Sequence, residues 1–326
     1  MIEINSRNIR IWSRLGPSGA VGTAAIELAQ QEKTNVFCTA DLCYFSGLDR
    51  LKSSFPQQFY NFGIAEQNMI GIAGGLAKEG LIPFATTYAS FATSRCLDQV
   101  RVNMAYMKLP IKLIGLTAGF GAGILGATHM SVEDLAIMRA LPNMVVLSPA
   151  DCTEIIKCIL AVAKTESPTY IRLTGPMNTP VVYNEDYNFE IGKAVMLEEG
   201  CDICFIATGS VVYEALQARK MLQEKNISVA LMNMHTIKPL DEDILQTVMN
   251  RNFKRIYTIE EHSVIGGLGS CVAEYISERN RDCIVTKIGI PDCFVPAGDY
   301  HYQLEQCGLT ANRIYNRVLQ DLERKG

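Results

Sequence analysis

The chain has 326 residues, of which 48% are hydrophobic and 20% are charged, and its formal net charge is -4 at pH 7. This length and composition predict a globular protein with two domains of ordinary size. A mildly acidic chain without a cluster of Lys and Arg residues argues against nucleic acid and anionic membrane surfaces as partners.

The start of the chain and its cysteines indicate a cytoplasmic protein. Residues 1–16 contain neither the apolar core of a signal peptide nor a membrane-spanning run. The 11 Cys residues are scattered and mostly lie in apolar surroundings, as reduced thiols of a cytosolic protein do. The CxxC pair of Cys201 and Cys204 has no second pair, so we expect core thiols there rather than a zinc or redox site.

The first half of the chain alternates short apolar strands with helices. After a polar leader, a helix is expected at 19–31, and strands are expected at 36–39, 81–89, 111–116, 144–148 and 169–173. This alternation predicts parallel strands in an open sheet that is covered on both faces. Ligands of such sheets bind beyond the carboxyl ends of the strands. The sequence places Asp41, Tyr88 and a Gly-rich loop with His129 at those ends.

The helix predicted at 64–77 is unusual because it is almost entirely apolar or glycine. A helix that is apolar on all sides is expected to be buried. Gly71, Gly74 and Gly75 weaken a helix, and we expect another backbone to pass close to them. Glu66 in its first turn is a carboxylate in an apolar setting, so it must be either neutral or bonded to a specific partner. A second interpretation is that Glu66 caps the amino end of its own helix.

Further along, the run 46–61 is expected to be a loop, and a helix is predicted from about Phe91 to Tyr106. Ser131 and Asp134 have the spacing of a capping box for the helix that ends near residue 140.

The second half repeats the alternation after a coil-like linker at 174–190. Strands are predicted at 204–207, 227–233, 255–261 and 283–290, with helices at 211–224, at 241–249 and from residue 270. The sequence therefore predicts an α/β protein with two doubly wound open-sheet domains, at 1–180 and 190–326. In the motif EEHSVIGGLGS, His262 and the glycines suit either an anion site at a helix amino end or a tight turn at a subunit contact.

The string FGIAEQNMIGIAGGLA, at 62–77, resembles the pyrimidine-binding segment of transketolases and related thiamine-diphosphate enzymes. The resemblance covers essentially the whole chain, as the C-terminal half of the full-length enzymes. It implies a pyrimidine-binding domain followed by a transketolase C-terminal-like domain. In that family the Glu of this string hydrogen-bonds the aminopyrimidine ring and relays a proton during cofactor activation. The resemblance thus implies a catalytic and cofactor-binding role for Glu66.

Two further segments resemble the same family. In TTYASFATSRCLDQVR, Phe91 would stack on the aminopyrimidine face with Tyr88 beside it, because aromatic rings suit a flat heteroaromatic ligand. Ile64 and Arg95 are further cofactor contacts that the resemblance implies. From the residues alone, two core aromatics on one helical turn remain an alternative. In GILGATHM, His129 aligns with a family His that faces the reacting thiazolium, which implies a catalytic role.

The diphosphate end of the cofactor has no recognisable site in the sequence. The family holds this end through Mg²⁺ with a GDG motif, which the chain lacks, and AGD at 297–299 lies in the wrong domain. We therefore expect no metal site on this chain and Mg²⁺ bound mainly by a partner. The expected partner is an N-terminal diphosphate-binding transketolase subunit in a heterotetramer, together with self-association.

The residues that correspond to substrate contacts depart from the family pattern. Leu125 stands in place of an acidic residue, Thr117 in place of a His, and Ser18 matches an expected Arg, while Asp41 is a further candidate at a strand end. Thr174 stands where a phosphate-binding Arg is expected. Losing Arg removes the strongest ordinary phosphate contact. Either the sugar-like substrate is not a simple ketose phosphate, or other groups bind its phosphate.

Together these features predict one subunit of a thiamine-diphosphate-dependent, transketolase-like transferase. It would move a two-carbon ketol unit between small sugar-like molecules, and only with its partner. One alternative is a relative of deoxyxylulose-phosphate synthase or of the beta subunit of a 2-oxoacid decarboxylase. Another is a non-catalytic regulatory paralogue, against which the retained Glu66, Phe91 and His129 argue, because an inactive copy does not need a buried carboxylate.

Overall fold

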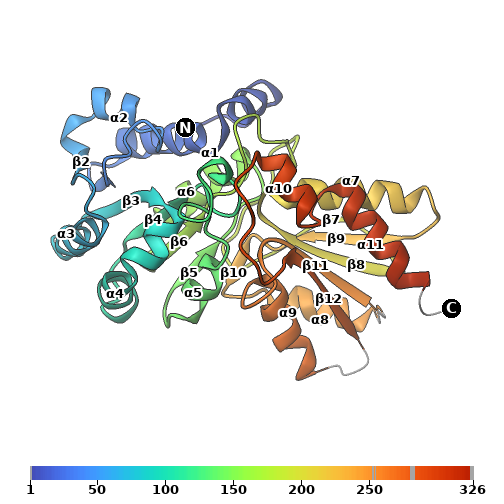
Figure 1. Cartoon of the computed structure of the whole chain (residues 1–326). Coiled ribbons are helices and arrows are strands. Elements are labelled where there is room, and N and C mark those ends of the chain that lie inside the picture. The colour runs from blue at the N-terminus through green and yellow to red at the C-terminus, as the bar shows by residue number, and fades with distance from the viewer. Residues whose placement is uncertain (1, 252, 254, 280–282, 324–326) are drawn as a thin grey trace.

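The computed structural model describes residues 2–251, 253, 255–279 and 283–323, and in these ranges two sheets form two α/β units (Figure 1). The first sheet has seven strands in the order β10-β5-β6-β4-β3-β1-β2, and the second has five in the order β12-β11-β8-β9-β7. Neighbouring strands are parallel except at the edges, where β10 pairs with β5 and β7 with β9 in antiparallel fashion. The predicted α/β class with two open sheets is confirmed.

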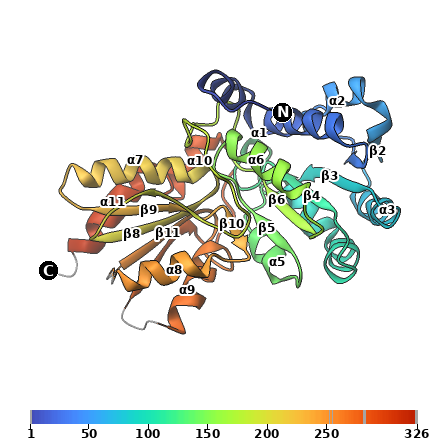
Figure 2. The same ribbon diagram turned by 180° about the vertical axis from the view of Figure 1, so that it is seen from behind.

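The first sheet lies between two layers of helices. Its strands are β1 (Asn35–Thr39), β2 (Phe59–Asn61), β3 (Ile82–Tyr88), β4 (Lys112–Leu116), β5 (Val145–Leu147), β6 (Thr169–Arg172) and β10 (Thr236–Lys238). One face is covered by α1 (Ser6–Gln31) and α6 (Cys152–Val162), and the other by α3 (Glu66–Lys78), by α5 (Asp134–Ala140) and by the helical segments at 91–106 (Figures 1 and 2). Every residue of β1, β4 and β6 is buried, as expected for a doubly covered parallel sheet.

The second unit is built in the same way. Its strands are β7 (Val195–Glu198), β8 (Ile203–Thr208), β9 (Val229–Asn233), β11 (Arg255–Ser263) and β12 (Ile284–Ile290). One face is covered by α7 (Val212–Gln223), after the short turn η5 (Gly209–Val211), and by α11 (Ala311–Glu323), and the other by α8 (Glu242–Asn250) and α9 (Leu268–Ser277). One hydrophobic cluster runs from Met69 and Leu135 in the first unit to Leu245 and Leu268 in the second, so the two units share a core.

The chain crosses between the units more than once. Residues 174–190, predicted as coil, contain no helix or strand. The chain then builds β7, β8 and β9 before β10 returns to the first sheet and pairs with β5. A strand of the second half thus completes the edge of the first sheet, which the sequence does not predict.

The amino-terminal segment is not a polar leader, and that expectation is wrong. α1 begins at Ser6, after Asn5 caps it by accepting hydrogen bonds from two backbone N–H groups. Ile9 and Trp12 are buried, which makes the segment part of the first unit. Gly16, with a φ of 73°, separates this first stretch from the helix predicted at 19–31.

α3 is buried on one side and not on all sides. Met69 is fully buried, whereas Ile72 is 37% exposed. Among the described residues, no atom lies within 4 Å of a Cβ built on Gly71 or Gly75, and the neighbour of Gly74 is a side chain. Within the described part of this chain, therefore, no second backbone passes close to these glycines.

Two segments near the site differ from their predicted form. The expected loop at 46–61 contains α2 (Asp49–Ser54), the 3₁₀ turn η1 (Pro56–Gln58) and β2. The helix at 91–106 is interrupted: the π-helical segments η2 (Phe91–Arg95) and η3 (Val100–Tyr106) flank the short α4 (Leu97–Gln99). In η2 the N–H of Cys96 donates to the carbonyl oxygen of Phe91 at 3.3 Å, five residues back. Such wide turns occur frequently at functional sites.

The predicted capping box at Ser131 and Asp134 is wrong. Glu133 is the N-cap of α5, and no side chain caps the helix there. The carboxylate of Asp134 instead bonds to Arg172 and to the hydroxyl of Tyr170 inside the protein.

Candidate active site

One edge of the first sheet gathers most of the predicted site residues. β1, β2, β3 and β4 are parallel, so their carboxyl ends meet at this edge. Tyr88 is the last residue of β3, α3 begins shortly after β2, and a Gly-rich loop at 117–130 follows β4. This loop includes the 3₁₀ turn η4 (Gly123–Leu125) and ends with His129 and Met130.

Glu66 is the first residue of α3 and is only 3% exposed. Its Oε1 accepts a hydrogen bond of 2.9 Å from Nη1 of Arg95. The carboxylate therefore reaches across to a neighbouring segment rather than to the amides of its own helix. This ion pair contradicts the capping interpretation, and it supplies the partner that a buried carboxylate requires.

Arg95 connects Glu66 to the aromatic residues of the site. The Cζ atom of Arg95 lies 3.9 Å from the centroid of the Phe91 ring, in a cation–π contact. The backbone of Arg95 is held as well, because Nε2 of Gln67 donates to its carbonyl oxygen at 3.0 Å. Both residues of the cation–π pair belong to η2, whose wide turn sets the spacing between them.

Three rings form a triangle beside this pair. The ring centroids of Tyr88 and Phe91 lie 5.8 Å apart, those of Tyr88 and His129 5.6 Å, and those of Phe91 and His129 5.3 Å. All three contacts are edge-to-face, the favourable geometry for aromatic rings. The Thr128 hydroxyl lies 2.9 Å from Nδ1 of His129 and orients its ring. Burial raises the pKa of Tyr88, so its phenol stays protonated at neutral pH.

Two aromatic residues that were not predicted from the sequence, Phe45 and Tyr44, extend the ring cluster. Phe45 lies 6.4 Å from Tyr88 and 5.8 Å from Tyr44, measured between ring centroids. Ser18, predicted as a substrate residue, donates its hydroxyl to the carbonyl oxygen of Phe45 at 2.6 Å and so anchors this loop. The sequence feature that could have identified them is the pair of adjacent aromatic residues shortly after the strand predicted at 36–39.

The other predicted residues make no bond to this cluster in the described part of the chain. Asp41 accepts a hydrogen bond of 3.1 Å from Asn61, and Ile64 and Leu125 are 78% and 50% exposed. Thr117 has a φ of 52°. Within the described part of the chain, Asp41, Ile64, Leu125 and Thr117 share no hydrogen bond or ring contact with Glu66, Arg95, Phe91, Tyr88 or His129.

Comparison with known proteins identifies the family. The family model described as "Transketolase, pyrimidine binding domain" matches residues 17–178, and "Transketolase, C-terminal domain" matches residues 192–314. The chain belongs to the transketolase family. Its first unit contains the pyrimidine-binding domain and its second the transketolase C-terminal domain.

Several relatives are themselves described as transketolase subunits. The chain is 39% identical over 303 residues to the 6-deoxy-6-sulfo-D-fructose transketolase subunit SqwH of Clostridium sp., covering 92% of each chain. It is 38% identical over 300 residues to an apulose-4-phosphate transketolase subunit of Phocaeicola vulgatus, covering 92% of this chain and 95% of the relative. A solved structure described as a split-gene transketolase, inactive beta4 tetramer, has a TM-score of 0.83 and 38% identity, over 93% of this chain and 97% of the other.

The cluster fits the aminopyrimidine end of thiamine diphosphate, the cofactor that the transketolase family implies. A flat cationic group, the guanidinium of Arg95, already lies against the Phe91 ring and bonds to the Glu66 carboxylate. The position that the Arg95 guanidinium occupies therefore has an apolar face and a buried acceptor, the two features that a flat, nitrogen-containing ring would use. Within the described residues, no group of three or more His, Cys, Asp and Glu side chains is placed to hold a metal ion.

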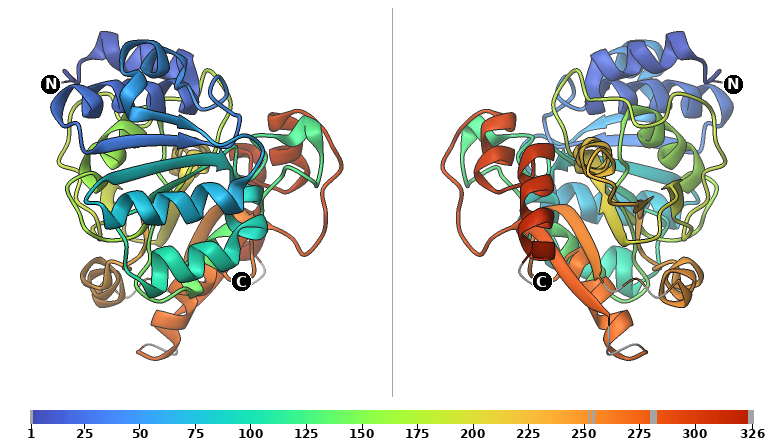
Figure 3. Two further views of the ribbon diagram at one scale, coloured as in Figure 1. Left: turned by 90° about the vertical axis from the view of Figure 1, so that its left-hand side faces the viewer. Right: turned by 90° about the vertical axis from the view of Figure 1, so that its right-hand side faces the viewer.

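The C-terminal domain of this transketolase chain holds the Gly-rich loop from the other side. Oε1 of Glu261 accepts a hydrogen bond of 2.6 Å from the N–H of Phe120, and Oε2 accepts from the hydroxyls of Ser210 and Tyr300. Burial raises the pKa of Glu261. The loop also bonds to the segment before α10 (Tyr300–Gln306), beside which it lies in Figure 3. Contacts between the two domains thus fix the loop that carries His129.

Arg172 points into the protein, as expected for a residue that continues β6. It is 1% exposed, its Nε bonds to Oδ2 of Asp134 at 2.8 Å, and its Nη2 donates to the carbonyl oxygen of Glu261 at 2.7 Å. Oγ1 of Thr174 accepts a hydrogen bond of 3.0 Å from the N–H of Ser210. Both side chains are therefore engaged in the contact between the domains.

The interpretation of the His262 motif as an anion site is wrong. The carboxylate of Glu260 already accepts hydrogen bonds from the N–H groups of Leu268 and Gly269, at 2.7 and 2.8 Å, at the amino end of α9. His262 is fully buried, and burial lowers its pKa to about 4, so its ring is neutral. The chain's own carboxylate thus fills the position that an anion would take.

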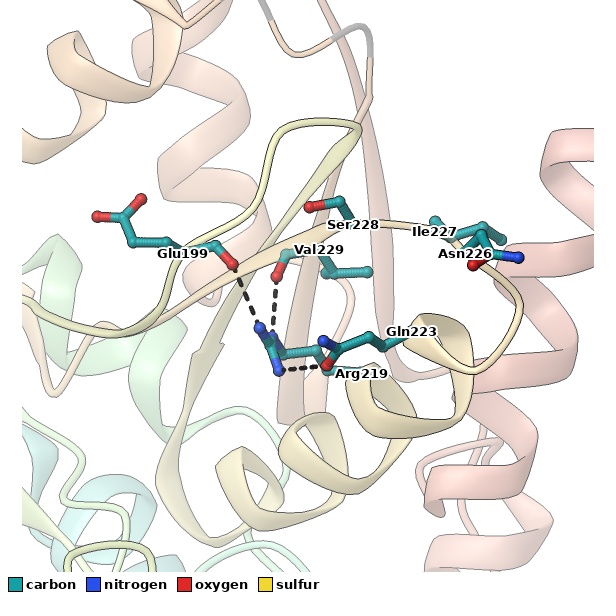
Figure 4. A pocket seen from close by; sticks show the side chains of 7 residues that line it. All are labelled: Glu199, Arg219, Gln223, Asn226, Ile227, Ser228 and Val229. Carbon is teal, nitrogen blue, oxygen red and sulfur yellow. Dashed lines mark hydrogen bonds between the residues drawn. The ribbon is translucent and has the colours of Figure 1, made fainter.

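A separate polar hollow of about 290 Å³ lies in the C-terminal domain, beside α7 and the start of β9 (Figure 4). Arg219 lines it, and its Nε, Nη1 and Nη2 already bond to Val229, Gln223 and Glu199. Its residues do not overlap the cluster around Glu66. Among the described helices, none is both long and apolar enough to cross a membrane.

Proposed function

We propose that this chain is the pyrimidine-binding subunit of a thiamine-diphosphate-dependent transketolase that moves a two-carbon ketol unit between sugar-like molecules. The observation that carries the proposal is the buried Glu66 carboxylate, which bonds to Arg95 at the carboxyl edge of a parallel sheet. Arg95 in turn lies on the ring of Phe91, and Phe91 contacts His129. Bound thiamine diphosphate would supply the carbon centre that accepts and releases the ketol unit.

The residues of the cluster take distinct roles in this proposal. Glu66 holds or moves a proton at a nitrogen of the pyrimidine ring, for which a buried and specifically placed carboxylate is suited. Phe91 and Tyr88 provide the apolar surface against which that ring packs. His129, on the Gly-rich loop next to both rings, bonds to the oxygens of the donor sugar.

The proposal includes a partner chain with the diphosphate site and Mg²⁺. Its support is the absence of a GDG motif from the sequence and the description of relatives as transketolase subunits. We place the two kinds of chain in a heterotetramer. The similar solved structure, described as an inactive tetramer of beta chains, supports self-association of this chain without activity. The 11 free cysteines support a cytoplasmic location.

The substrate in this proposal is a sugar other than a simple ketose phosphate. Ile124 and Leu125 expose 76% and 50% of their surface on the Gly-rich loop, where other transketolases place a charged contact. The names of two relatives contain modified sugars, 6-deoxy-6-sulfo-D-fructose and apulose 4-phosphate.

Reconstitution tests the function. The chain is mixed with the diphosphate-binding partner, thiamine diphosphate and Mg²⁺, and a panel of ketose donors is offered with an aldose acceptor. Mass spectrometry should show an acceptor lengthened, and a donor shortened, by two carbons. The chain alone and the partner alone serve as controls and should be inactive. Release of carbon dioxide from pyruvate without ketol transfer would instead identify a synthase-like or decarboxylase-like enzyme, and no turnover of either kind would support a regulatory chain.

A further inference from the structure

Within the part of the chain that the structure describes, the side chain of Arg95 makes one hydrogen bond and one cation–π contact, and both are with groups that the proposed function assigns to the cofactor. Its guanidinium bonds to Oε1 of Glu66 at 2.9 Å and lies 3.9 Å from the centroid of the Phe91 ring. At 3.9 Å the cation is in van der Waals contact with the ring face. A second flat group therefore does not fit between Arg95 and Phe91.

The guanidinium resembles an aminopyrimidine in the properties that these two groups recognise. It is planar, it stacks on aromatic faces, and its N–H groups donate hydrogen bonds to a carboxylate. A lysine ammonium lacks the planar shape, although it carries the same charge. Arg95 thus satisfies the buried carboxylate and covers the aromatic face with one flat side chain.

The local structure allows the side chain to leave while the backbone stays. Gln67 holds the carbonyl oxygen of Arg95 at 3.0 Å, and the N–H of Cys96 closes the π-helical turn onto Phe91. The side chain of Arg95, by contrast, is 45% exposed, whereas that of Glu66 is 4% exposed. Rotation of the Arg95 side chain into solvent therefore opens the contact without rebuilding the turn.

We propose that Arg95 is an internal substitute for the aminopyrimidine ring, which the cofactor displaces when it binds. In the absence of cofactor, Arg95 keeps the buried carboxylate of Glu66 paired and the Phe91 face covered. Cofactor binding breaks both contacts, so Arg95 lowers the apparent affinity for the cofactor and slows its association. This inference rests on the proposed function, because it requires a cofactor that uses Glu66 and Phe91.

The first test compares cofactor binding by variants of the assembled protein. Arg95→Ala removes the competing side chain, and thiamine diphosphate with Mg²⁺ should then bind roughly threefold to tenfold more tightly, the range for a partly exposed charged contact. The affinity of Arg95→Lys for the cofactor should lie between that of the unaltered assembly and that of Arg95→Ala. Arg101→Ala is the matched control: Arg101 is exposed on η3 and pairs with Asp98, so its loss should not change binding.

Titration calorimetry gives the dissociation constant, and stopped-flow fluorescence gives the association rate. If Arg95→Ala binds the cofactor more weakly than the unaltered assembly, or no differently from Arg101→Ala, the inference is overturned. If the unaltered assembly does not bind thiamine diphosphate, it is the proposed function that fails.

The second test concerns the isolated chain and does not involve the cofactor. Urea unfolding of the chain and of its Glu66→Gln, Arg95→Ala and doubly substituted variants forms a double-mutant cycle. We expect the two substitutions to be coupled by at least about threefold in the unfolding equilibrium constant, as for a partly buried ion pair. Additive effects would show that Arg95 and Glu66 are not paired without cofactor, which would overturn the inference even if the cofactor binds normally.

Discussion

At the scale of single residues, the site depends on a buried carboxylate: Glu66 accepts a hydrogen bond from Arg95, and Arg95 lies on the ring of Phe91. Glu66, Phe91 and His129 lie in long motifs with a specific order, and the structure brings them into one cluster. The pairing of Glu66 with Arg95 was not predictable, because it depends on the π-helical turn η2 and on contact between residues 29 positions apart. Phe45 was missed for a different reason: a loop aromatic has no periodic pattern.

Glu66→Gln should abolish turnover of the assembled enzyme while leaving the fold intact. The amide keeps the size and polarity of the side chain but does not hold or move a proton, and loss of such a group typically reduces rates by about 10²–10⁴-fold. Exchange of the C2 proton of bound thiamine diphosphate with deuterium, followed by NMR, should slow to a similar extent.

Glu79→Gln is the control for this substitution, since Glu79 is exposed at the end of the same helix. It should leave exchange unchanged. An unchanged exchange rate in Glu66→Gln would show that Glu66 only pairs with Arg95 and takes no part in proton transfer.

Among the elements, buried strands were easier to predict than amphipathic or edge elements. β1, β4, β6 and β8 are fully buried strands with apolar residues at their centres, and they occur where predicted to within one residue at each end. β7 and β10 are short edge strands of four and three residues, and neither was predicted. α11 is not among the predicted elements, although Ile314 and Val318, four residues apart, are buried on one side of it.

β4 is unusual among the buried strands because it contains a lysine, Lys112, although every residue of the strand is buried. Nζ of Lys112 donates to the carbonyl oxygens of Thr165 and Ser167, both at 2.7 Å, and to the Thr165 hydroxyl at 3.2 Å. Burial lowers the pKa of Lys112 to about 7, an effect partly offset by the charge of Glu166. The three hydrogen bonds satisfy the ammonium and hold the start of β4 against the segment that leads into β6.

This lysine should make the stability of the chain depend on pH. The unfolded chain keeps the Lys112 proton up to about pH 10.4, whereas the folded chain releases it above about pH 7. Between these values the unfolded state binds more protons, so the free energy of unfolding rises with pH. From pH 7 to pH 9 the contribution of Lys112 to the free energy of unfolding should increase by about 1–2 kcal/mol. This increase is smaller than desolvation alone would give, because the three hydrogen bonds favour the ammonium.

Urea unfolding at pH 7 and pH 9, with reductant, measures this effect. Lys112→Met should remove the increase, and Lys164→Met, at an exposed lysine after α6, should keep it. Equal pH slopes in the unaltered chain and in Lys112→Met would show that Lys112 stays charged in the folded protein.

At the scale of the whole molecule, the two domains of the chain are joined by a buried polar network as well as by a shared apolar cluster. Arg172 bonds to Asp134 and to the carbonyl oxygen of Glu261, and the Glu261 carboxylate reaches Phe120 in the Gly-rich loop. The sequence predicts both domains but not this network, because its members are far apart in the chain. The C-terminal domain therefore contributes to the site by holding the loop in place.

Binding of the cofactor should require the partner chain. The residues of the cluster around Glu66 fit the pyrimidine end of thiamine diphosphate, whereas the sequence contains no GDG motif for its diphosphate. Calorimetry of the isolated chain with thiamine diphosphate and Mg²⁺ should show weak binding or none, and addition of the partner should restore stoichiometric binding. Tight binding by the isolated chain would contradict the proposed division of the site.

The choice of substrate also belongs to the assembled molecule. Leu125 and Thr117 stand where other transketolases are expected to place charged or polar substrate contacts, and Thr174, in place of an Arg, is buried and bonded to Ser210. Each missing contact to a charged group should weaken transition-state binding by roughly 1.5–3 kcal/mol. Xylulose 5-phosphate should therefore be a poor donor, and a sugar with a deoxy, amino or otherwise modified carbon chain should be a better one.

Steady-state kinetics of the reconstituted enzyme decide between these donors, with kcat/KM compared for phosphorylated, unphosphorylated and modified ketoses at a fixed aldose acceptor. Leu125→Glu restores an acidic side chain on the exposed Gly-rich loop, where the substitution disturbs no packed core. It should shift preference toward hydroxyl-rich donors, because a carboxylate accepts hydrogen bonds that Leu125 does not. Efficient use of xylulose 5-phosphate by the unaltered enzyme would mean that the partner chain supplies the phosphate contacts and that Leu125 does not set the specificity.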